Sequence, residues 1–112
     1  MERVRKTIFY KRYFLDFFES QRLKVKKRIT WTLDVIETVA QVPEQYLKHL
    51  EGTDGLYEIR VQAGSDIFRI FCFFDKGKLV VLMNGFHKKT MKTPPSEIEK
   101  ALKIKKEYEN SK

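Results

Sequence analysis

The sequence predicts a small α+β domain, in which a twisted, mainly antiparallel sheet is combined with two helices near the start of the chain and one at its end. Three observations support this class. Apolar residues recur at helical spacing over about residues 11–40, three short β-prone segments follow over residues 56–86, and a second helical pattern covers residues 93–108. At 112 residues and 42% hydrophobic content the chain can fill one core, so we expect a single domain over residues 1–112.

The first third predicts a strand followed by two helices. The stretch "KTIFY" at 6–10 is short, apolar and suited to a strand. Phe14, Phe17 and Phe18 then recur at helical spacing, and four further apolar residues follow at steps of four, four and three: Val25, Ile29, Leu33 and Ile36. We expect a break between the two helices near Ser20–Leu23, and Pro43 closes the segment.

The second half predicts a three-strand meander and a last helix. The strands are "LYEIRV", "DIFRIFCFF" and "KLVVLMNGF", joined by "AGSD" and "DKGK", which are short enough for hairpins. The helix begins in "TPPSEIEK", where Thr93 is the expected N-cap, Pro94 or Pro95 lies in the first turn, and acidic residues favour the positive end of the helix dipole.

Two assumed turns determine which side chains share a face of the sheet. A turn at Gly64–Ser65 places Arg60 opposite Arg69, and a turn at Lys76–Gly77 places Arg69 opposite Asn84. Alternation then gives one face with Glu58, Arg60, Arg69, Asn84 and Phe86. The other face, where we expect the helices to pack, carries Tyr57, Ile59, Val61, Phe68, Ile70, Cys72, Phe74, Leu79, Val81 and Met83.

The facing arginines have two explanations. Two like charges directly opposite each other destabilise a sheet by up to about 1 kcal/mol unless something neutralises them. In one interpretation Glu58 pairs with one arginine and solvent accommodates the other. In the other interpretation Arg60 and Arg69 form an anion site for a ligand phosphate, because Arg makes bidentate phosphate contacts.

Cations gather where the last strand leaves the sheet, in "GFHKKTMKTPP". The prolines and Thr93 are needed to start a helix, but His87, Lys88, Lys89 and Lys92 are not. We expect them near the Arg69–Asn84 end of the sheet, with Phe86 available to stack on a base. His87 is either an ordinary loop residue or a group that exchanges a proton near neutral pH.

The composition indicates an acidic partner and excludes several other classes. The formal net charge is +8 and the pI about 9.6, which suits nucleic acid, an anionic membrane surface or an acidic protein. No apolar run approaches the ~20 residues of a membrane span, and no signal peptide opens the chain. We interpret Cys72, the single cysteine, as a small buried hydrophobic residue, and we expect no zinc site because no other ligand lies near it in the sequence. With no disulfide possible within the chain, we expect the protein in the reducing cytoplasm. In "RLKVKKR", Lys26 and Lys27 are either a solvated helix face or secondary phosphate contacts.

Two stretches, "HLEGTDGLYEIRV" and "FRIFCFFDKGKLVVLMNGFHKKTMKTPPSEIEKALKIKKEY", resemble the RelE/HigB superfamily of toxins, and in particular its phage-derived, HigB-like branch. The resemblance covers roughly residues 44–108. It implies a RelE-like fold and the toxin of a type II toxin–antitoxin pair. Such a toxin acts in the ribosomal A site and cuts mRNA there without a metal or cofactor. The 2′-hydroxyl attacks the adjacent phosphate and leaves a 2′,3′-cyclic phosphate and a 5′-hydroxyl.

The resemblance also implies roles for individual residues. Arg60 and Arg69 would stabilise the charged phosphate, and His87 would be a general acid or base. Glu58 would be either a base or the ion-pair partner of Arg60. Phe86 would orient a base, and the remaining expected RNA contacts are Lys88, Lys89, Lys92, Asn84, Lys26 and Lys27.

The expected partners are mRNA on the ribosome and a cognate antitoxin protein. We expect contact with DNA only indirectly, through the antitoxin, because the chain shows no helix-turn-helix signal of its own, and we expect no membrane association. The competing hypothesis is a non-catalytic RNA- or protein-binding module that retains the fold and the basic edge without cleaving RNA.

Overall fold

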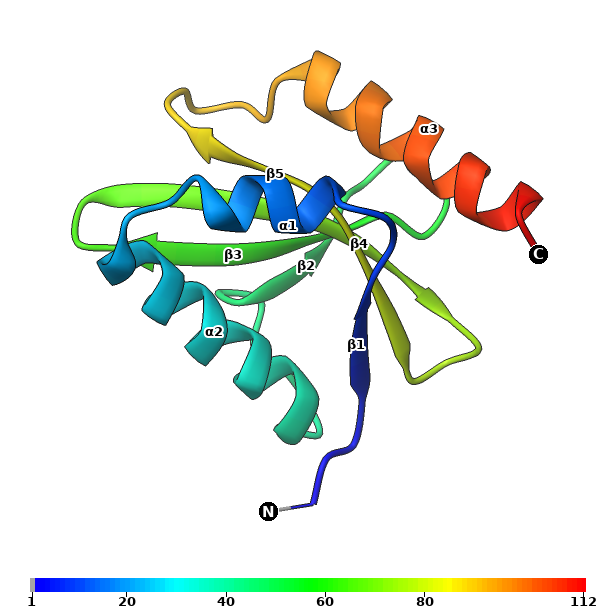
Figure 1. Cartoon of the computed structure of the whole chain (residues 1–112), viewed down its shortest axis with the longest axis horizontal. Coiled ribbons are helices and arrows are strands. Elements are labelled where there is room, and N and C mark those ends of the chain that lie inside the picture. Colours follow the sequence, from blue (N-terminus) through cyan, green and yellow to red (C-terminus); the bar gives the residue numbers. More distant parts are fainter. Residues whose placement is uncertain (1) are drawn as a thin grey trace.

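Within residues 2–112, the part of the chain that this computed structural model describes, there are five strands and three helices (Figure 1). In chain order they are β1 (Lys6–Phe9), α1 (Tyr13–Glu19), α2 (Leu23–Thr38), β2 (Leu47–His49), β3 (Tyr57–Ala63), β4 (Asp66–Asp75), β5 (Leu79–Lys88) and α3 (Pro95–Asn110). The predicted α+β class and the predicted order of elements are confirmed. The sequence did not predict β2, which has only three residues.

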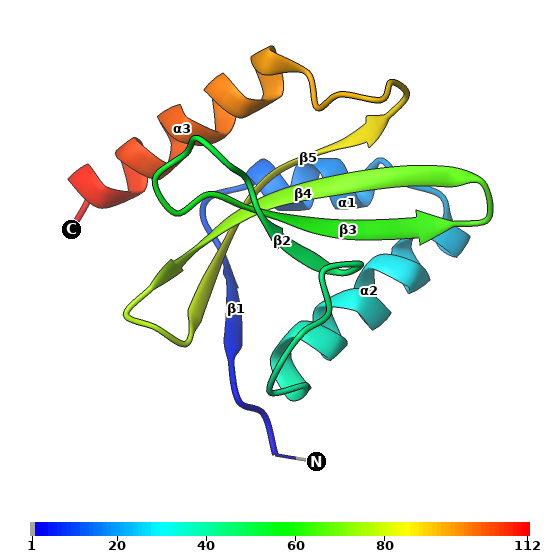
Figure 2. The same cartoon turned by 180° about the vertical axis from the view of Figure 1, so that it is seen from behind.

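The five strands form one sheet in the order β1-β5-β4-β3-β2. β1 runs parallel to β5, and every other neighbouring pair is antiparallel, so the predicted mainly antiparallel sheet is confirmed. The sheet is twisted, and β1 and β3 run in clearly different directions in Figures 1 and 2. β4 lies at the centre and the meander β3–β4–β5 carries the side chains of interest.

Helices cover both faces of this sheet, whereas the sequence reading placed them all on one. Helices α1 and α2 cover a core that includes Phe14, Ile29 and Ile70, and α3 covers a second core that includes Phe71 and Ala101. The prediction of a single helix-bearing face is wrong because the central strand β4 is apolar on both sides. Each apolar side must be covered by another layer.

The register of β3 against β4 is the predicted one, but the register of β4 against β5 is two residues off. Arg60 lies opposite Arg69, across the two-residue turn that follows Ala63. On the other side Arg69 lies opposite Phe86, not opposite Asn84. The same offset places Ile67 opposite Lys88.

Two local features cause this shift. The β4–β5 loop holds three residues, Lys76 to Lys78, since Asp75 pairs with Leu79, and both Lys76 and Gly77 have positive φ. A β-bulge between Ile70 and Cys72 then adds one further residue of offset. The loop alone reverses the faces of the first half of β5 relative to the prediction, and the bulge restores the predicted faces in the second half. Two residues therefore change to the α1/α2 core, Val80 and Leu82, and two to the α3 core, Val81 and Met83.

Close packing against α1 explains the glycine in the second half of β5. A Cβ atom added to Gly85 would lie 2.5 to 2.8 Å from ring carbons of Phe17, a distance that packed atoms do not adopt. Phe17 packs against the α1/α2 core. A residue without a side chain is therefore needed where α1 crosses β5.

The start of α3 differs from the expectation in one respect. The N-cap is Pro94, without a side-chain hydrogen bond, and Pro95 opens the helix. Thr93 is not the N-cap because its hydroxyl donates instead to Glu58 Oε2 at 3.0 Å. This contact joins the loop before α3 to the polar face of the sheet.

The predicted burial of Cys72 is confirmed, and burial raises the pKa of its thiol. None of the helices within residues 2–112 is long and apolar enough to cross a membrane.

Candidate active site

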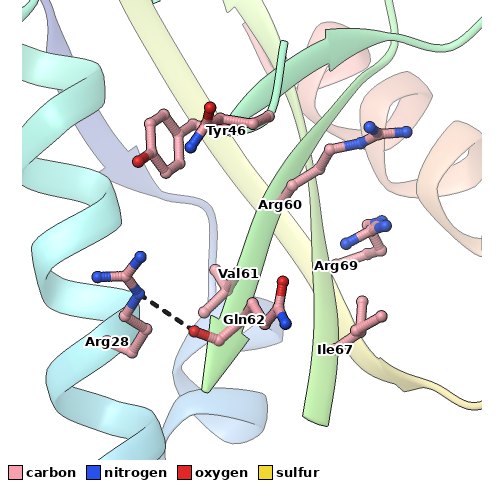
Figure 3. Close-up of a pocket in the computed structure, with 8 residues that line it drawn as sticks. Arg28, Tyr46, Arg60, Val61, Gln62, Ile67 and Arg69 are labelled. Atoms are coloured by element: carbon pink, nitrogen blue, oxygen red, sulfur yellow. Dashed lines mark hydrogen bonds between the residues drawn. The ribbon is translucent and has the colours of Figure 1, made fainter. Parts of the chain in front are cut away.

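Arg60 and Arg69 form the centre of the polar face, as the sequence predicted. They occupy directly opposite positions on β3 and β4, so their side chains project on the same side of the sheet (Figure 3). Arg69 is 9% exposed, and its Nη1 donates to the Phe68 carbonyl at 3.1 Å. Burial, followed by the neighbouring charge of Arg60, lowers the pKa of Arg69. The chain thus places two cations side by side where at least one is largely removed from water.

Glu58 neutralises part of this charge. It is 4% exposed, and its Oε2 lies 3.6 Å from Arg69 Nε, an ion-pair distance that is too long for a hydrogen bond. Thr93 donates to the same carboxylate oxygen. The structure therefore pairs Glu58 with Arg69, whereas the sequence left Glu58 as either a base or the ion-pair partner of Arg60. Arg69 Nε and Arg60 Nε are both buried without a hydrogen-bond partner in residues 2–112.

Lys88 is the third cation of this face. It lies opposite Ile67, two positions along β4 from Arg69, and is half-buried. Burial, together with the charges of Arg69 and Arg60, lowers the pKa of Lys88, and Glu58 opposes the shift. These couplings place Lys88 within electrostatic range of all three residues. A lysine with a lowered pKa gives up its proton more readily than an ordinary surface lysine.

Phe86 lies on the arginine face, as predicted, but Asn84 does not lie opposite Arg69 and its side chain bonds to α3 instead. Phe86 is opposite Arg69, and its ring centroid is 5.6 Å from that of Phe71. Asn84 is 2% exposed, and its Nδ2 donates to the main-chain oxygen of Glu97 at 3.2 Å and to Glu97 Oε1 at 3.0 Å. Its place beside Arg69 in the prediction depended on the register that the bulge changes.

His87 lies on the opposite face of the sheet from the arginines. It is opposite Phe68 on β4, and the two rings stack with centroids 4.7 Å apart. Its Nε2 is 3.6 Å from Asp66 Oδ1, and the other oxygen of Asp66 accepts a hydrogen bond from Arg22 at 2.8 Å. His87 therefore lies at the expected end of the sheet, but the expectation that it lies beside Arg69 is wrong because its side chain is on the other face.

The remaining predicted lysines lie in the loop after β5 and on α2. Lys89 and Lys92 are exposed in the loop between β5 and α3. Lys26 and Lys27 lie on α2, on the side of the sheet that carries His87, and Lys26 Nζ is 5.9 Å from the Phe18 ring centroid. The structure does not bring these two lysines to the arginine face.

Arg28 and Tyr46 also lie close to the arginines, and the sequence reading missed both. A pocket of about 270 Å³ runs from Arg60 and Arg69 past Tyr46 to Arg28 on α2 (Figure 3). Arg28 belongs to the basic run "RLKVKKR", which was the only available signal. Tyr46 lies in a segment for which no element was predicted.

No cluster of His, Cys, Asp and Glu that could hold a metal ion occurs in residues 2–112. The arrangement on the arginine face can bind a phosphate through guanidinium groups and can exchange a proton through Lys88 or Glu58.

Comparison with known proteins gives a match to one family model and a match to a solved structure, and no match among curated proteins. The model of a family described as phage derived protein Gp49-like matches residues 16–106. Among solved structures, a chain of the archaeal RelE–RelB complex from Pyrococcus horikoshii OT3 superposes with a TM-score of 0.57 at 18% identity, covering 77% of this chain and 97% of that one. The superposition shows that the fold is RelE-like.

Proposed function

This chain belongs to the phage-derived Gp49-like family, and we propose that it is the toxin of a type II toxin–antitoxin pair and an mRNA endonuclease. The proposal comprises the whole chain as one toxin domain, acting in the cytoplasm on mRNA in the ribosomal A site. The observation that carries it is the pairing of Arg60 with Arg69 on one sheet face, joined by Lys88. Three cations around one small surface fit a phosphodiester.

The proposed reaction uses side chains of this face alone. The 2′-hydroxyl oxygen attacks the adjacent phosphorus, the bond from phosphorus to the 5′-oxygen breaks, and the products are a 2′,3′-cyclic phosphate and a 5′-hydroxyl. Arg60 and Arg69 stabilise the negative charge that builds up on the phosphorane oxygens. Lys88, as an ammonium, donates a proton to the departing 5′-oxygen, a role that the sequence reading assigned to His87.

Glu58 acts twice in this scheme. In the free protein it is the counter-charge of Arg69, at 3.6 Å. When the substrate phosphate takes its place on Arg69, the released carboxylate accepts the proton of the 2′-hydroxyl. The two alternatives for Glu58, base and ion-pair partner, thus become successive states of one residue.

An antitoxin is the proposed protein partner. The similar archaeal chain comes from a RelE–RelB complex, and the net charge of +8 suits an acidic covering segment. DNA contact is proposed only through that antitoxin.

Expression of the chain alone in a bacterium tests the function. We expect growth arrest and cleaved mRNA with a 2′,3′-cyclic phosphate end, and we expect Arg69→Ala to restore growth. Unimpaired growth and intact mRNA at a verified level of folded protein would refute the toxin. If the same protein still bound RNA, the non-catalytic binding module would be the better description.

A further inference from the structure

The pocket beside the arginines continues around the open edge of β3. β2 starts only at Leu47, which pairs with Ile59, so it reaches no further along β3. The last backbone bond on this edge runs from Arg60 N to the Tyr46 carbonyl, at 2.8 Å. Beyond that point no strand of residues 2–112 covers this edge of β3, and Arg28 reaches across from α2 to the Gln62 carbonyl at 3.1 Å (Figure 3). The open edge therefore leaves a hollow that faces both α2 and the arginine pair.

The hollow is cationic and has unused donors. Its lining residues, all within the described part of the chain, are Arg28, Gln45, Tyr46, Arg60, Val61, Gln62, Ile67 and Arg69. Three of them are guanidinium groups and none is a carboxylate. The buried Nε atoms of Arg60 and Arg69 have no hydrogen-bond partner in residues 2–112. Buried donors without partners are costly, so an anion bound here would satisfy groups that the fold leaves unmet.

Trp31 holds both far walls of this hollow in place. The Arg28 guanidinium carbon lies 4.1 Å from the Trp31 ring centroid, and the Tyr46 ring meets Trp31 edge-on at 5.4 Å. Arg28 is further fixed by its bond to the Gln62 carbonyl. A cation and an aromatic ring, both held by the same indole, form a preorganised pair of contacts for phosphate and base.

We propose that this hollow binds one nucleotide of single-stranded RNA, next to the phosphate that is cleaved, with its own phosphate on Arg28 and its base against Tyr46. The inference rests on the proposed RNA-cleaving function and adds a substrate subsite to it. The hollow has a volume of about 270 Å³, close to the lower limit of ~300 Å³ for small-ligand pockets. Its size therefore limits the occupant to a single nucleotide.

Trp31, the only tryptophan, provides a direct readout. The full chain is titrated with a single-stranded RNA tetranucleotide that is 2′-O-methylated at every ribose and so cannot be cleaved by 2′-hydroxyl attack. Affinity is measured by the anisotropy of a labelled copy, and occupancy of the hollow by Trp31 fluorescence. We expect a saturable change in Trp31 emission for the wild type.

Substitutions then assign the two contacts. Loss of a charge-assisted phosphate contact is worth ~10-fold or more in affinity, so Arg28→Ala should weaken binding by about that factor. Tyr46→Ala should weaken it ~5-fold to 100-fold and Tyr46→Phe should not, because stacking needs only the ring. Arg12→Ala is the matched control: it removes the same charge from the N-cap of α1, where Arg12 pairs with Asp16 and Glu19, and should leave binding unchanged.

The outcomes separate this inference from the proposed function. If Arg28→Ala and Tyr46→Ala both keep their fold and bind the tetranucleotide as the wild type does, the nucleotide subsite is refuted even where mRNA cleavage is intact. If the chain cleaves no mRNA but binds the tetranucleotide through Arg28 and Tyr46, the nucleotide subsite is supported and the proposed endonuclease activity is refuted. An equal Trp31 response to inorganic phosphate, or to an acidic peptide at the same concentration, would overturn the assignment of a base to Tyr46.

Discussion

Replacing Glu58 by Gln is the substitution that tests the arginine face most directly. It removes one negative charge, keeps the shape of the side chain, and leaves Arg60 and Arg69 without their internal counter-charge. In the folded protein Glu58 and Arg69 are 4% and 9% exposed, so water screens their interaction only weakly. The substitution therefore bears on both stability and catalysis.

The expected loss of stability follows from the distance. At 3.6 Å and an effective dielectric constant of about 20, the Coulomb attraction between Glu58 and Arg69 is roughly 4.6 kcal/mol. Breaking a buried pair by removing one partner costs roughly 3–5 kcal/mol. The Arg60 side chain is partly exposed and the amide of Gln can still accept from Thr93, so we expect a loss near the lower end, about 3 kcal/mol in the free energy of unfolding. A domain of this size, at roughly 5–15 kcal/mol, remains folded.

Urea unfolding at pH 7 measures this loss, and RNA binding and mRNA cleavage complete the test. Without the competing carboxylate, Glu58→Gln should bind the uncleavable tetranucleotide more tightly than the wild type. Without the base, its cleavage should fall ~10²-fold to 10⁴-fold. Unchanged stability and unchanged RNA affinity would refute the counter-charge, and wild-type cleavage by Glu58→Gln would refute the base.

Three further predictions concern β5. Lys88→Ala should lower mRNA cleavage ~10²-fold or more, as expected for loss of a general acid, whereas His87→Ala should retain most of the cleavage activity. The reverse result in a cleavage assay would show that His87, not Lys88, transfers the proton. Because burial and Arg69 lower the pKa of Lys88, the cleavage rate should decline as pH rises through that lowered pKa, beginning below the ordinary lysine value of about 10.4, and a pH–rate profile flat to that value would contradict the role. Gly85→Ala should destabilise the fold by about 1–3 kcal/mol through its clash with Phe17, and adding Phe17→Leu should recover part of the loss in urea unfolding.

The sequence was sufficient for the half of the site that depends on a tight turn. A two-residue hairpin has one register, and Gly64–Ser65 supplied the glycine that such a turn favours, with φ of +63° at Gly64. The facing of Arg60 and Arg69 followed directly and is confirmed. The sequence also predicted the fold class and the break between the first two helices, because both depend on local periodicity. In the structure α1 ends at Glu19 and α2 starts at Leu23.

What the sequence could not supply depends on contacts between distant segments. Arg28 and Tyr46 are separated from Arg69 by 41 and 23 residues, and they meet at a part of the β3 edge that is open because β2 starts only at Leu47. The packing of α3 on the second face was hidden for a related reason. A continuous apolar strand such as "IFCFF" is compatible with burial on one side or on both.

One β-bulge determines which side chain from "GFHKK" joins the arginines. Side chains alternate between faces at every residue, so an odd offset in β5 exchanges His87 and Lys88 between the two sides of the sheet. The three-residue loop and the bulge together shift the pairing by two, which restores Phe86 to the arginine face but at the position opposite Arg69. Lys88 then follows on that face and His87 stacks on Phe68 behind it. His87 and Lys88, the last two residues of β5, therefore lie on opposite faces of the sheet, and burial and the charge of Arg69 lower the pKa of the one on the arginine face, Lys88.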